Sequence, residues 1–393
     1  MNRRNIFLAI HCLVILSVAY VSAQTTQPTT RPRGFARRPA TTPSMVQDAD
    51  TGQWYTPMHH AEYAFGADLS SLKQQEDNGR VFKDTNGQAK PGLEIFRNHG
   101  YNWIRLRVCV EPARLPQNVD YTIAEAQAAK KLGFKFLLDI HYSNAWADPT
   151  NEPTPITWQN LTHPQRIDAV FDYTRDTIAK MAAAGVLPDI VQVGNEVSNG
   201  FLWPSGKLPE NWDQFADYIY AGVNGIDAGR GDGKRPKIMI HVDHGGNVEL
   251  THRFFDKFNS YDIPYDMIGF SFYPWSHGTL VDLRANLAFT AETYHKDIMV
   301  VETGYYHQPS PYFQDTPGPF PETPEGQADW LAAVNQVVMD TPDGRGKGVF
   351  WWEPAGAGGL GGRSYFDSDG NALSPIFSVF HQFTRPIHRV DNQ

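Results

Sequence analysis

Residues 189–196 read DIVQVGNE, an apolar run that ends on an Asn-Glu pair. Residues 297–302 read DIMVVE and have the same form, again ending on a glutamate. A strand gains nothing in packing by ending on a carboxylate. Continuous apolar runs are typical of parallel β-strands covered on both faces, and polar residues at their carboxyl ends are typical of sites built there.

Six further runs of similar length lie between residues 60 and 360. The eight runs cover residues 63–69, 103–110, 135–142, 189–196, 237–243, 267–273, 297–302 and 348–353. Helical spacing is clearest in residues 122–132, 164–184, 212–226 and 326–339. Eight strand-then-helix units predict an α/β fold, a (β/α)₈ TIM barrel. The alternative is an open doubly wound sheet, but no glycine-rich dinucleotide loop follows an early strand.

Polar residues gather at the carboxyl ends of these runs. They are Asp68, Arg107, Asp139, His141, Asn195, Glu196, His241, Asp243, Ser271, Tyr273, Glu302 and Glu353. In a closed barrel these ends meet at one face, where active sites are built. The sequence therefore predicts a single polar site at that face.

Glu196 and Glu302 end the fourth and the seventh run, so their side chains are expected to face each other over the barrel mouth. Two carboxyl groups are what glycoside hydrolysis needs, one to protonate the leaving oxygen and one to attack or support the anomeric carbon. The amide of Asn195 is placed to bind a sugar hydroxyl beside the reacting carbon. An isolated strand-end glutamate would more often form a salt bridge, but this combination favours catalysis.

Other chemistries have little support. The chain has no G-x-S-x-G, no H-E-x-x-H and no Cys/His metal spacing, and nothing near His59 and His60 completes a ligand set, so no metal site is expected. Cys109 stands alone in an apolar run and is expected to be a buried, inert thiol. Residues 1–44 hold six Arg and no acidic residue, which leaves −15 on the remainder against −9 for the chain. That charge disfavours nucleic acid and anionic membranes as partners and suits a neutral substrate.

The amino-terminal region has the features of an exported protein. Residues 1–23 combine Arg3 and Arg4 with a short apolar run and a Val-Ser-Ala ending, which predicts a cleaved signal peptide. Residues 24–58 are predicted to form a disordered linker rich in Thr, Pro and Arg, with a lead-in to the first strand. The catalytic domain is expected at 59–388. We expect a secreted or periplasmic monomer with no membrane contact after the signal is removed.

Several strings resemble glycoside hydrolase family 53. They are FGADLS (65–70), GYNWIRLRV (100–108), LLDIHYSNAWADP (137–149), VQVGNEVSNGFLWP (191–204), IGFSFYPW (268–275), VVETGY (300–305) and FWWEPA (350–355). The resemblance spans roughly residues 60–385. It implies a retaining, clan A arabinogalactan endo-β-1,4-galactanase that acts on type I arabinogalactan, with Glu196 as acid/base and Glu302 as nucleophile.

The same resemblance implies a role for most polar and aromatic residues of the cleft. Trp146 and Asp148 would line the subsites on the non-reducing side, and either Arg105 or Arg107 would hold Glu302 ionised. His141 and Asn195 would contact the sugar at the cleavage point. A floor and stacking platform would come from Tyr273, Trp275 and Trp352. The full set of expected substrate-binding residues is Asp68, Arg105, Arg107, His141, Trp146, Asp148, Asn195, His241, Ser271, Tyr273, Trp275 and Trp352.

Two features depart from the family pattern. Some bacterial members bind calcium after strand seven, but no such ligand set can be assigned in residues 305–327, and residues 355–373 are short and glycine-rich. No cofactor is therefore expected. Asn144 stands where the family often has Asp, which predicts an altered substrate contact.

Two alternative functions remain open at this point. One is another clan A endo-glycanase, such as a mannanase or glucanase, with the same carboxylates and different subsites. The other is a non-catalytic galactan-binding protein on the same scaffold, which the presence of both glutamates disfavours.

Overall fold

The computed structural model describes residues 46–47, 54–55, 63–112, 116–356 and 358–384. The expected signal peptide, nearly all of the expected linker and the His59–His60 pair lie outside the described residues. Within the linker, β1 (Val46–Gln47) and β2 (Trp54–Tyr55) pair in antiparallel fashion. No helix of the described residues has both the length and the apolar character needed to cross a membrane.

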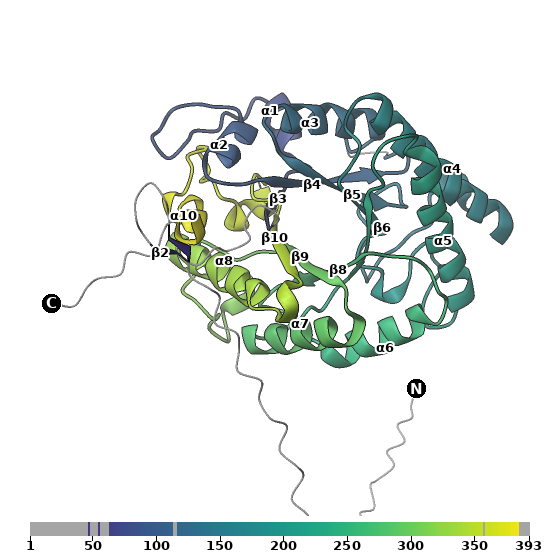
Figure 1. Ribbon diagram of the computed structural model, residues 1–393. Coiled ribbons are helices and arrows are strands. Elements are labelled where there is room, and N and C mark those ends of the chain that lie inside the picture. The colour runs from purple at the N-terminus through teal and green to yellow at the C-terminus, as the bar shows by residue number, and fades with distance from the viewer. Residues whose placement is uncertain (1–45, 48–53, 56–62, 113–115, 357, 385–393) are drawn as a thin grey trace, which may run out of the picture. The chain divides into compact units, whose positions relative to one another are not determined.

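Eight parallel strands close into a barrel, as the sequence predicted (Figure 1). The strands are β3 (Ala64–Asp68), β4 (Trp103–Cys109), β5 (Lys135–His141), β6 (Ile190–Val193), β7 (Lys237–Val242), β8 (Met267–Phe272), β9 (Asp297–Thr303) and β10 (Gly346–Trp352). They follow one another around the ring in chain order, and β10 closes it against β3. The fold is therefore a (β/α)₈ barrel.

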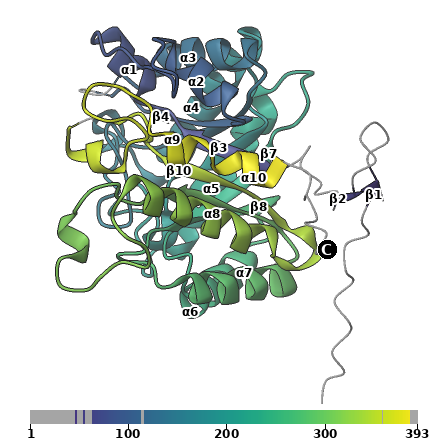
Figure 2. The same cartoon turned by 90° about the vertical axis from the view of Figure 1, so that its left-hand side faces the viewer.

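Helices surround the ring. They are α1 (Leu72–Asp77), α2 (Gly92–Asn98), α3 (Val119–Lys131), α4 (His163–Ala183), α5 (Trp212–Gly229), α6 (Val248–Asn259), α7 (Leu280–Tyr294), α8 (Pro324–Met339), α9 (Ser374–Phe377) and α10 (Val379–Thr384). Short 3-10 turns are η1 (Ile156–Trp158), η2 (Val197–Asn199), η3 (Pro311–Phe313), η4 (Pro342–Gly344) and η5 (Gly358–Arg363). Figure 2 shows α2 and α3 on the side of the barrel opposite α6 and α7.

The helix ends follow the local sequence. Before α4, the backbone N–H of Thr162 donates to the Gln165 side chain at 2.9 Å, and α4 is followed by Gly185 at φ +74°. Before α3, the Asn118 side chain accepts from Tyr121 N at 3.0 Å. Such caps satisfy backbone groups that a helix end leaves unpaired. The helices expected at 122–132 and 164–184 are thereby confirmed, with starts at Val119 and His163.

The inside of the barrel has two tiers. All eight strands contribute to a buried apolar lower tier made of Ala64, Trp103, Leu137, Ile190, Met239, Met267, Met299, Val301 and Phe350. A Cβ on Gly66 would lie 2.3 Å from the Phe350 ring, so that strand position needs a glycine. Buried polar side chains, among them Arg105 and Asp139, form the upper tier toward the carboxyl ends. The polar site therefore rests on a close-packed apolar floor.

The fourth barrel strand is shorter than the sequence indicated. β6 ends at Val193, and the chain turns at Gly194, whose φ is +81°. A side chain at Gly194 would lie 2.6 Å from Val197 Cγ1. Glu196 itself takes a left-handed conformation at φ +46°, which is uncommon for a residue with a Cβ. Glu196 is thus held on a tight turn just beyond the strand, whereas Glu302 lies within β9.

Candidate active site

Arg105, fully buried on β4, lies at the centre of the polar tier. Its Nη1 lies 2.8 Å from both Asp68 Oδ2 and Glu302 Oε1, and its Nη2 lies 2.9 Å from both Asp139 Oδ2 and Asn195 Oδ1. A planar guanidinium can hold several carboxylates at fixed angles, which an ammonium group cannot do. Arg105 therefore connects four residues that come from four different places around the barrel.

Glu302 is held at both carboxylate oxygens. Oε1 pairs with Arg105, and Oε2 accepts a hydrogen bond from Tyr273 Oη at 3.0 Å. Burial raises the pKa of the Glu302 carboxyl, and the positive charge of Arg105 opposes this shift. The carboxylate form is the one to which both partners donate, so the geometry favours an ionised Glu302.

Glu196 is the carboxyl group of the pair that keeps its proton more strongly. Burial first, and then the charge of Glu302, raise the pKa of Glu196 well above its ordinary value. Because the charge of Glu302 disfavours ionisation of Glu196, the proton stays on Glu196, while Glu302 forms the ion pair with Arg105. Glu196 with Glu302 thus forms a pair in which one acid is protonated and the other is charged.

A chain of hydrogen bonds orients Glu196. His241 Nδ1 lies 2.9 Å from Gln192 Nε2 and 3.3 Å from Glu196 N, two donors, and 3.1 Å from Asn195 Oδ1, an acceptor. The nearest partner is a donor, so we assign the ring proton to Nε2. His241 Nε2 then donates to Ser271 Oγ at 3.0 Å. This leaves the Ser271 hydroxyl free to donate to the Glu196 carboxyl. Burial lowers the pKa of His241 well below 6.5, which keeps the ring neutral and this direction of donation fixed.

Asp139 and His141 support the same centre from β5. His141 Nδ1 accepts from Ala147 N at 3.1 Å, so Nε2 carries the proton that it donates to Asp139 Oδ2 at 2.8 Å. Burial alone would raise the pKa of Asp139, but Arg105 and His141 together lower it to about 2. Asn195 Nδ2 donates to Ala147 O at 2.8 Å, which ties the loop after β5 to the turn after β6.

Of the two arginines expected beside the nucleophile, only Arg105 is paired with Glu302. Arg107 instead forms a close ion pair with Glu353, which also accepts a hydrogen bond from Ser71 Oγ. The Arg107 guanidinium lies 5.0 Å from the Trp146 ring centroid and 5.8 Å from that of Trp352. Arg107 therefore connects the ion-pair network to the aromatic side chains at the rim.

Aromatic rings line two sides of this centre. Trp146 meets Trp352 edge-on at 6.0 Å between ring centroids, and Trp146 is 40% exposed. Trp275 stacks on Tyr273 at 5.0 Å. Arg363, which sequence reasoning did not single out, lies 4.8 Å above the Trp352 ring. These rings are accessible apolar faces beside the carboxyl pair, as a sugar-binding cleft requires.

Two residues expected to contact substrate, Asn144 and Asp148, also form hydrogen bonds within the protein. Asn144 uses its amide on the backbone: Nδ2 donates to Val110 O at 2.6 Å, and Oδ1 accepts from Ile156 N at 2.7 Å. An aspartate could not make the first of these bonds, so Asn144 holds two loops together here. Asp148 is exposed and accepts from Thr150 Oγ1 at 2.6 Å, outside the Arg105 network.

Gln192 was missed by sequence reasoning because it lies inside a strand and not at its end. Its Nε2 donates to Asp139 Oδ1 at 2.6 Å and to His241 Nδ1 at 2.9 Å. A polar residue in the middle of an otherwise apolar run was the available signal. The expectation for Cys109 is confirmed, since the thiol is buried and burial raises its pKa to about 12.

A cavity of about 440 Å³ lies at the opposite end of the barrel. It is lined by first residues of several strands, among them Trp103, Lys135, Ile190, Lys237, Met267 and Asp297. Residues at this end of a TIM barrel serve stability, and the cavity holds neither Glu196 nor Glu302. We therefore place the active site at the carboxyl ends of the strands.

Glu125 on α3 is a buried acid outside the pair, and it allows a prediction about stability. Burial and then Glu353 raise its pKa well above 4.5, and its Oε1 has no hydrogen-bond partner among the residues that the structure describes. The folded protein therefore keeps a proton that the unfolded chain loses above about pH 4.5, and stability falls as pH rises through that window. The side chain of Glu125→Gln does not titrate. The Tm of this variant minus that of the wild type should therefore be larger at pH 8 than at pH 5, by about 2 °C or more. Calorimetry at both pH values measures this gain. A constant Tm difference would contradict the prediction.

Comparison with known proteins agrees with this geometry. The sequence profile described as Glycosyl hydrolase family 53 matches residues 64–375. A Thermothelomyces thermophilus protein named arabinogalactan endo-beta-1,4-galactanase is 37% identical, over 81% of this chain and 98% of its own length. A structure of fungal beta-1,4-galactanases superposes with a TM-score of 0.73 at 35% identity, covering 81% of this chain and 98% of that one. The Ignisphaera aggregans GH53 catalytic domain superposes with a TM-score of 0.76 at 30% identity, covering 81% and 95%. The chain belongs to glycosyl hydrolase family 53.

Proposed function

We propose that this protein is an arabinogalactan endo-β-1,4-galactanase that cleaves β-1,4-galactosidic bonds with retention of configuration. The supporting observation is the unequal carboxyl pair. Glu302 is bound by Arg105 and Tyr273, while Glu196 is held by Ser271 and has a pKa raised well above its ordinary value. Family membership and the printed names of the relatives support the substrate.

In the first step, the Glu302 carboxylate attacks the anomeric carbon of the galactosyl unit. Glu196 donates its proton to the glycosidic oxygen as the bond to the leaving sugar breaks, which leaves a galactosyl ester on Glu302. The Arg105 guanidinium and Tyr273 hydroxyl fix the attacking oxygens, so little reorganisation is needed at the moment of reaction.

In the second step, Glu196 acts as a base instead of an acid. Once Glu302 is esterified its charge is gone, so the pKa of Glu196 falls and the carboxylate can remove a proton from water. The water oxygen attacks the anomeric carbon and the ester bond breaks. Glu302 returns as a carboxylate and Glu196 is protonated again.

The substrate assignment is tested by measuring new reducing ends on linear β-1,4-galactan, cellulose and β-1,4-mannan under the same conditions. We expect release from galactan alone. Proton NMR during the first minutes should show the β-anomer of the new reducing end first, because two displacements restore the configuration. Faster release from mannan or cellulose would support another endo-glycanase, and tight galactan binding without new ends would support a non-catalytic binding protein.

The aromatic rim gives a prediction about substrate affinity. Trp352 lies between Trp146 and Arg363, and its ring is partly accessible. Trp352→Ala should raise KM for galactan roughly 5–10-fold while changing kcat less, because stacking acts on bound substrate and product alike. Steady-state kinetics on galactan measures both constants. A fall in kcat with an unchanged KM would show that Trp352 acts in the chemical step.

We further propose that residues 1–23 form a cleaved signal peptide, that the enzyme works outside the cytoplasm, and that it acts as a monomer without a cofactor. The sequence features of residues 1–58 support the first two statements. Mass spectrometry of the mature protein from the culture medium and periplasm tests them, with an amino terminus near Gln24 as the expected result. Light scattering tests the monomer, and activity in the presence of EDTA tests cofactor independence.

A further inference from the structure

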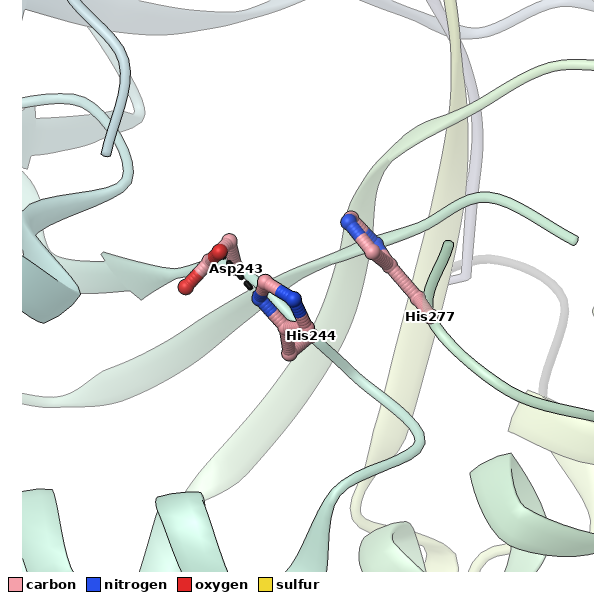
Figure 3. A group of neighbouring side chains, drawn as sticks. All are labelled: Asp243, His244 and His277. Carbon is pink, nitrogen blue, oxygen red and sulfur yellow. Dashed lines mark hydrogen bonds and ion pairs between the residues drawn. The ribbon is translucent and has the colours of Figure 1, made fainter. Parts of the chain in front are cut away.

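Three side chains of types that can bind a metal ion meet beside the active site, at the ends of two neighbouring strands. Asp243 and His244 follow β7, and His277 belongs to the loop after β8 (Figure 3). Each offers one ligand atom, and these atoms lie within 4.8 Å of one another. The His244 and His277 rings are next to each other, with 4.6 Å between their centroids. Sequence reasoning expected no metal site, and the Arg105 network uses none of these residues.

Hydrogen bonds hold His277 and Asp243 as they would be held in a metal site. His277 Nδ1 lies 3.0 Å from the carbonyl oxygen of Ser271, which can only accept, and 3.3 Å from the backbone N–H of Tyr273, which can only donate. The carbonyl oxygen is the nearer partner, so we assign the proton to Nδ1 and the free lone pair to Nε2. Asp243 Oδ1 accepts from the Ser198 hydroxyl, and Asp243 N donates to Ser198 Oγ at 3.1 Å. Metal-binding histidines almost always donate their other N–H to a carbonyl or carboxylate, and metal-binding carboxylates are themselves hydrogen-bonded.

We propose that Asp243, His244 and His277 form a binding site for a divalent transition-metal ion of the Zn²⁺ class. Two imidazoles and one carboxylate suit Zn²⁺ and its neighbours Co²⁺ and Ni²⁺, whereas Ca²⁺ and Mg²⁺ prefer oxygen ligands alone. Three protein ligands leave a fourth position for water. The site lies after the fifth and sixth barrel strands, β7 and β8, whereas the calcium loop of some bacterial family members follows the seventh, which is β9 here.

Solvent reaches the cluster at the His244 side chain. Tetrahedral Zn²⁺ with bonds of about 2.0–2.2 Å places its ligand atoms roughly 3.3 Å apart, so the cluster must tighten slightly to bind it. The His244 side chain is 41% exposed and can make that movement, while Asp243 is buried and stays in place. Before binding, His244 Nδ1 is hydrogen-bonded to Asp243 Oδ2, so binding through these two atoms releases one proton to solvent.

The proposal is tested by titrating ZnCl₂ into the full chain in a calorimeter. The variants are His244→Gln, His277→Gln and the double variant, with His252→Gln as matched control. His252 is exposed and paired with Asp256, so it reports ordinary surface binding. We expect one Zn²⁺ site in the wild type and in the control. Its Zn²⁺ affinity should fall roughly 100-fold or more in each single variant, since loss of a supporting partner alone lowers metal affinity about 10–100-fold. Binding to other parts of the chain, such as His59 and His60, is common to all variants and cancels in the comparison.

Co²⁺ provides an independent readout, because its visible absorption reports ligand number and type. The wild type and His252→Gln should give the intense visible bands of a four-coordinate site. These bands should be absent from the double variant. Circular dichroism and Tm without metal check that each variant is folded, so a lost site cannot be mistaken for a lost fold. Equal Zn²⁺ affinity in the wild type and the folded double variant would overturn the proposal, as would equal affinity of the wild type for Ca²⁺. Neither readout depends on hydrolysis, so the result is separate from the proposed function.

Discussion

Glu302→Gln is expected to lower galactan hydrolysis by roughly 10⁴-fold or more while leaving the fold intact, because an amide cannot form the galactosyl ester. The glutamine keeps the shape and one acceptor oxygen, so Arg105 and Tyr273 retain part of their contacts with position 302. Galactan binding should therefore survive. Reducing-end release measures the loss of rate, and calorimetry with galacto-oligosaccharides measures the retained affinity.

Glu325→Gln is the matched control, since Glu325 is exposed in the first turn of α8. It should leave kcat and KM unchanged. Hydrolysis by Glu302→Gln at more than about a hundredth of the wild-type rate would remove Glu302 from the nucleophile role.

Azide distinguishes the two glutamates further, with an aryl galacto-oligosaccharide whose leaving group needs no proton. Glu302→Ala should form the α-galactosyl azide, because azide attacks directly from the face that the carboxylate has left. Glu196→Ala should form the β-azide, because azide attacks the ester on Glu302 from the opposite face. The reverse pattern would exchange the two roles.

Arg105→Lys is expected to lower kcat roughly 100-fold and to lower Tm, although the positive charge is kept. One ammonium group cannot reach Asp68, Asp139 and Glu302 together as the guanidinium does. A nucleophile displaced by about 1 Å costs on the order of 10²-fold in rate. Unfilled contacts among buried carboxylates should also cost roughly 2 kcal/mol of folding free energy.

The control for Arg105 is Arg175→Lys, because Arg175 pairs with Asp172 and Asp176 on the exposed face of α4. Exposed pairs contribute about 0–1 kcal/mol, so its rate and Tm should stay near those of the wild type. Steady-state kinetics and thermal unfolding measure both variants. A wild-type kcat in a stably folded Arg105→Lys enzyme would show that charge alone, without the fork geometry, is enough to hold Glu302.

The sequence was sufficient for the barrel, because apolar strand runs are local signals, and the strand-end glutamates are the local signal on which the proposed carboxyl pair rests. It could not decide between Arg105 and Arg107, since both alternate to the same side of β4. Which carboxylate each arginine meets depends on the tilt and register of strands on the other side of the ring. The Arg107–Glu353 pair joins residues 246 positions apart.

Two other features were beyond local signals for related reasons. The end of β6 at Val193 depends on a left-handed turn at Gly194 and Glu196, which an apolar run with a single glycine does not indicate. The Asp243–His244–His277 cluster needs the loops after β7 and β8 to be neighbours, with α6 between them in the chain. Parallel pairing of β7 with β8 makes the two loops neighbours, and the conformations of these loops then bring the three ligand atoms together.

The apolar floor below Arg105 has a consequence for engineering. Met239, Met299 and Phe350 belong to the apolar tier below Arg105, so a smaller residue there would open a void into which the charged tier could sink. Such a substitution should therefore lower heat tolerance and reaction rate together, because the same methionine and phenylalanine atoms support the height of the proposed catalytic carboxyl groups.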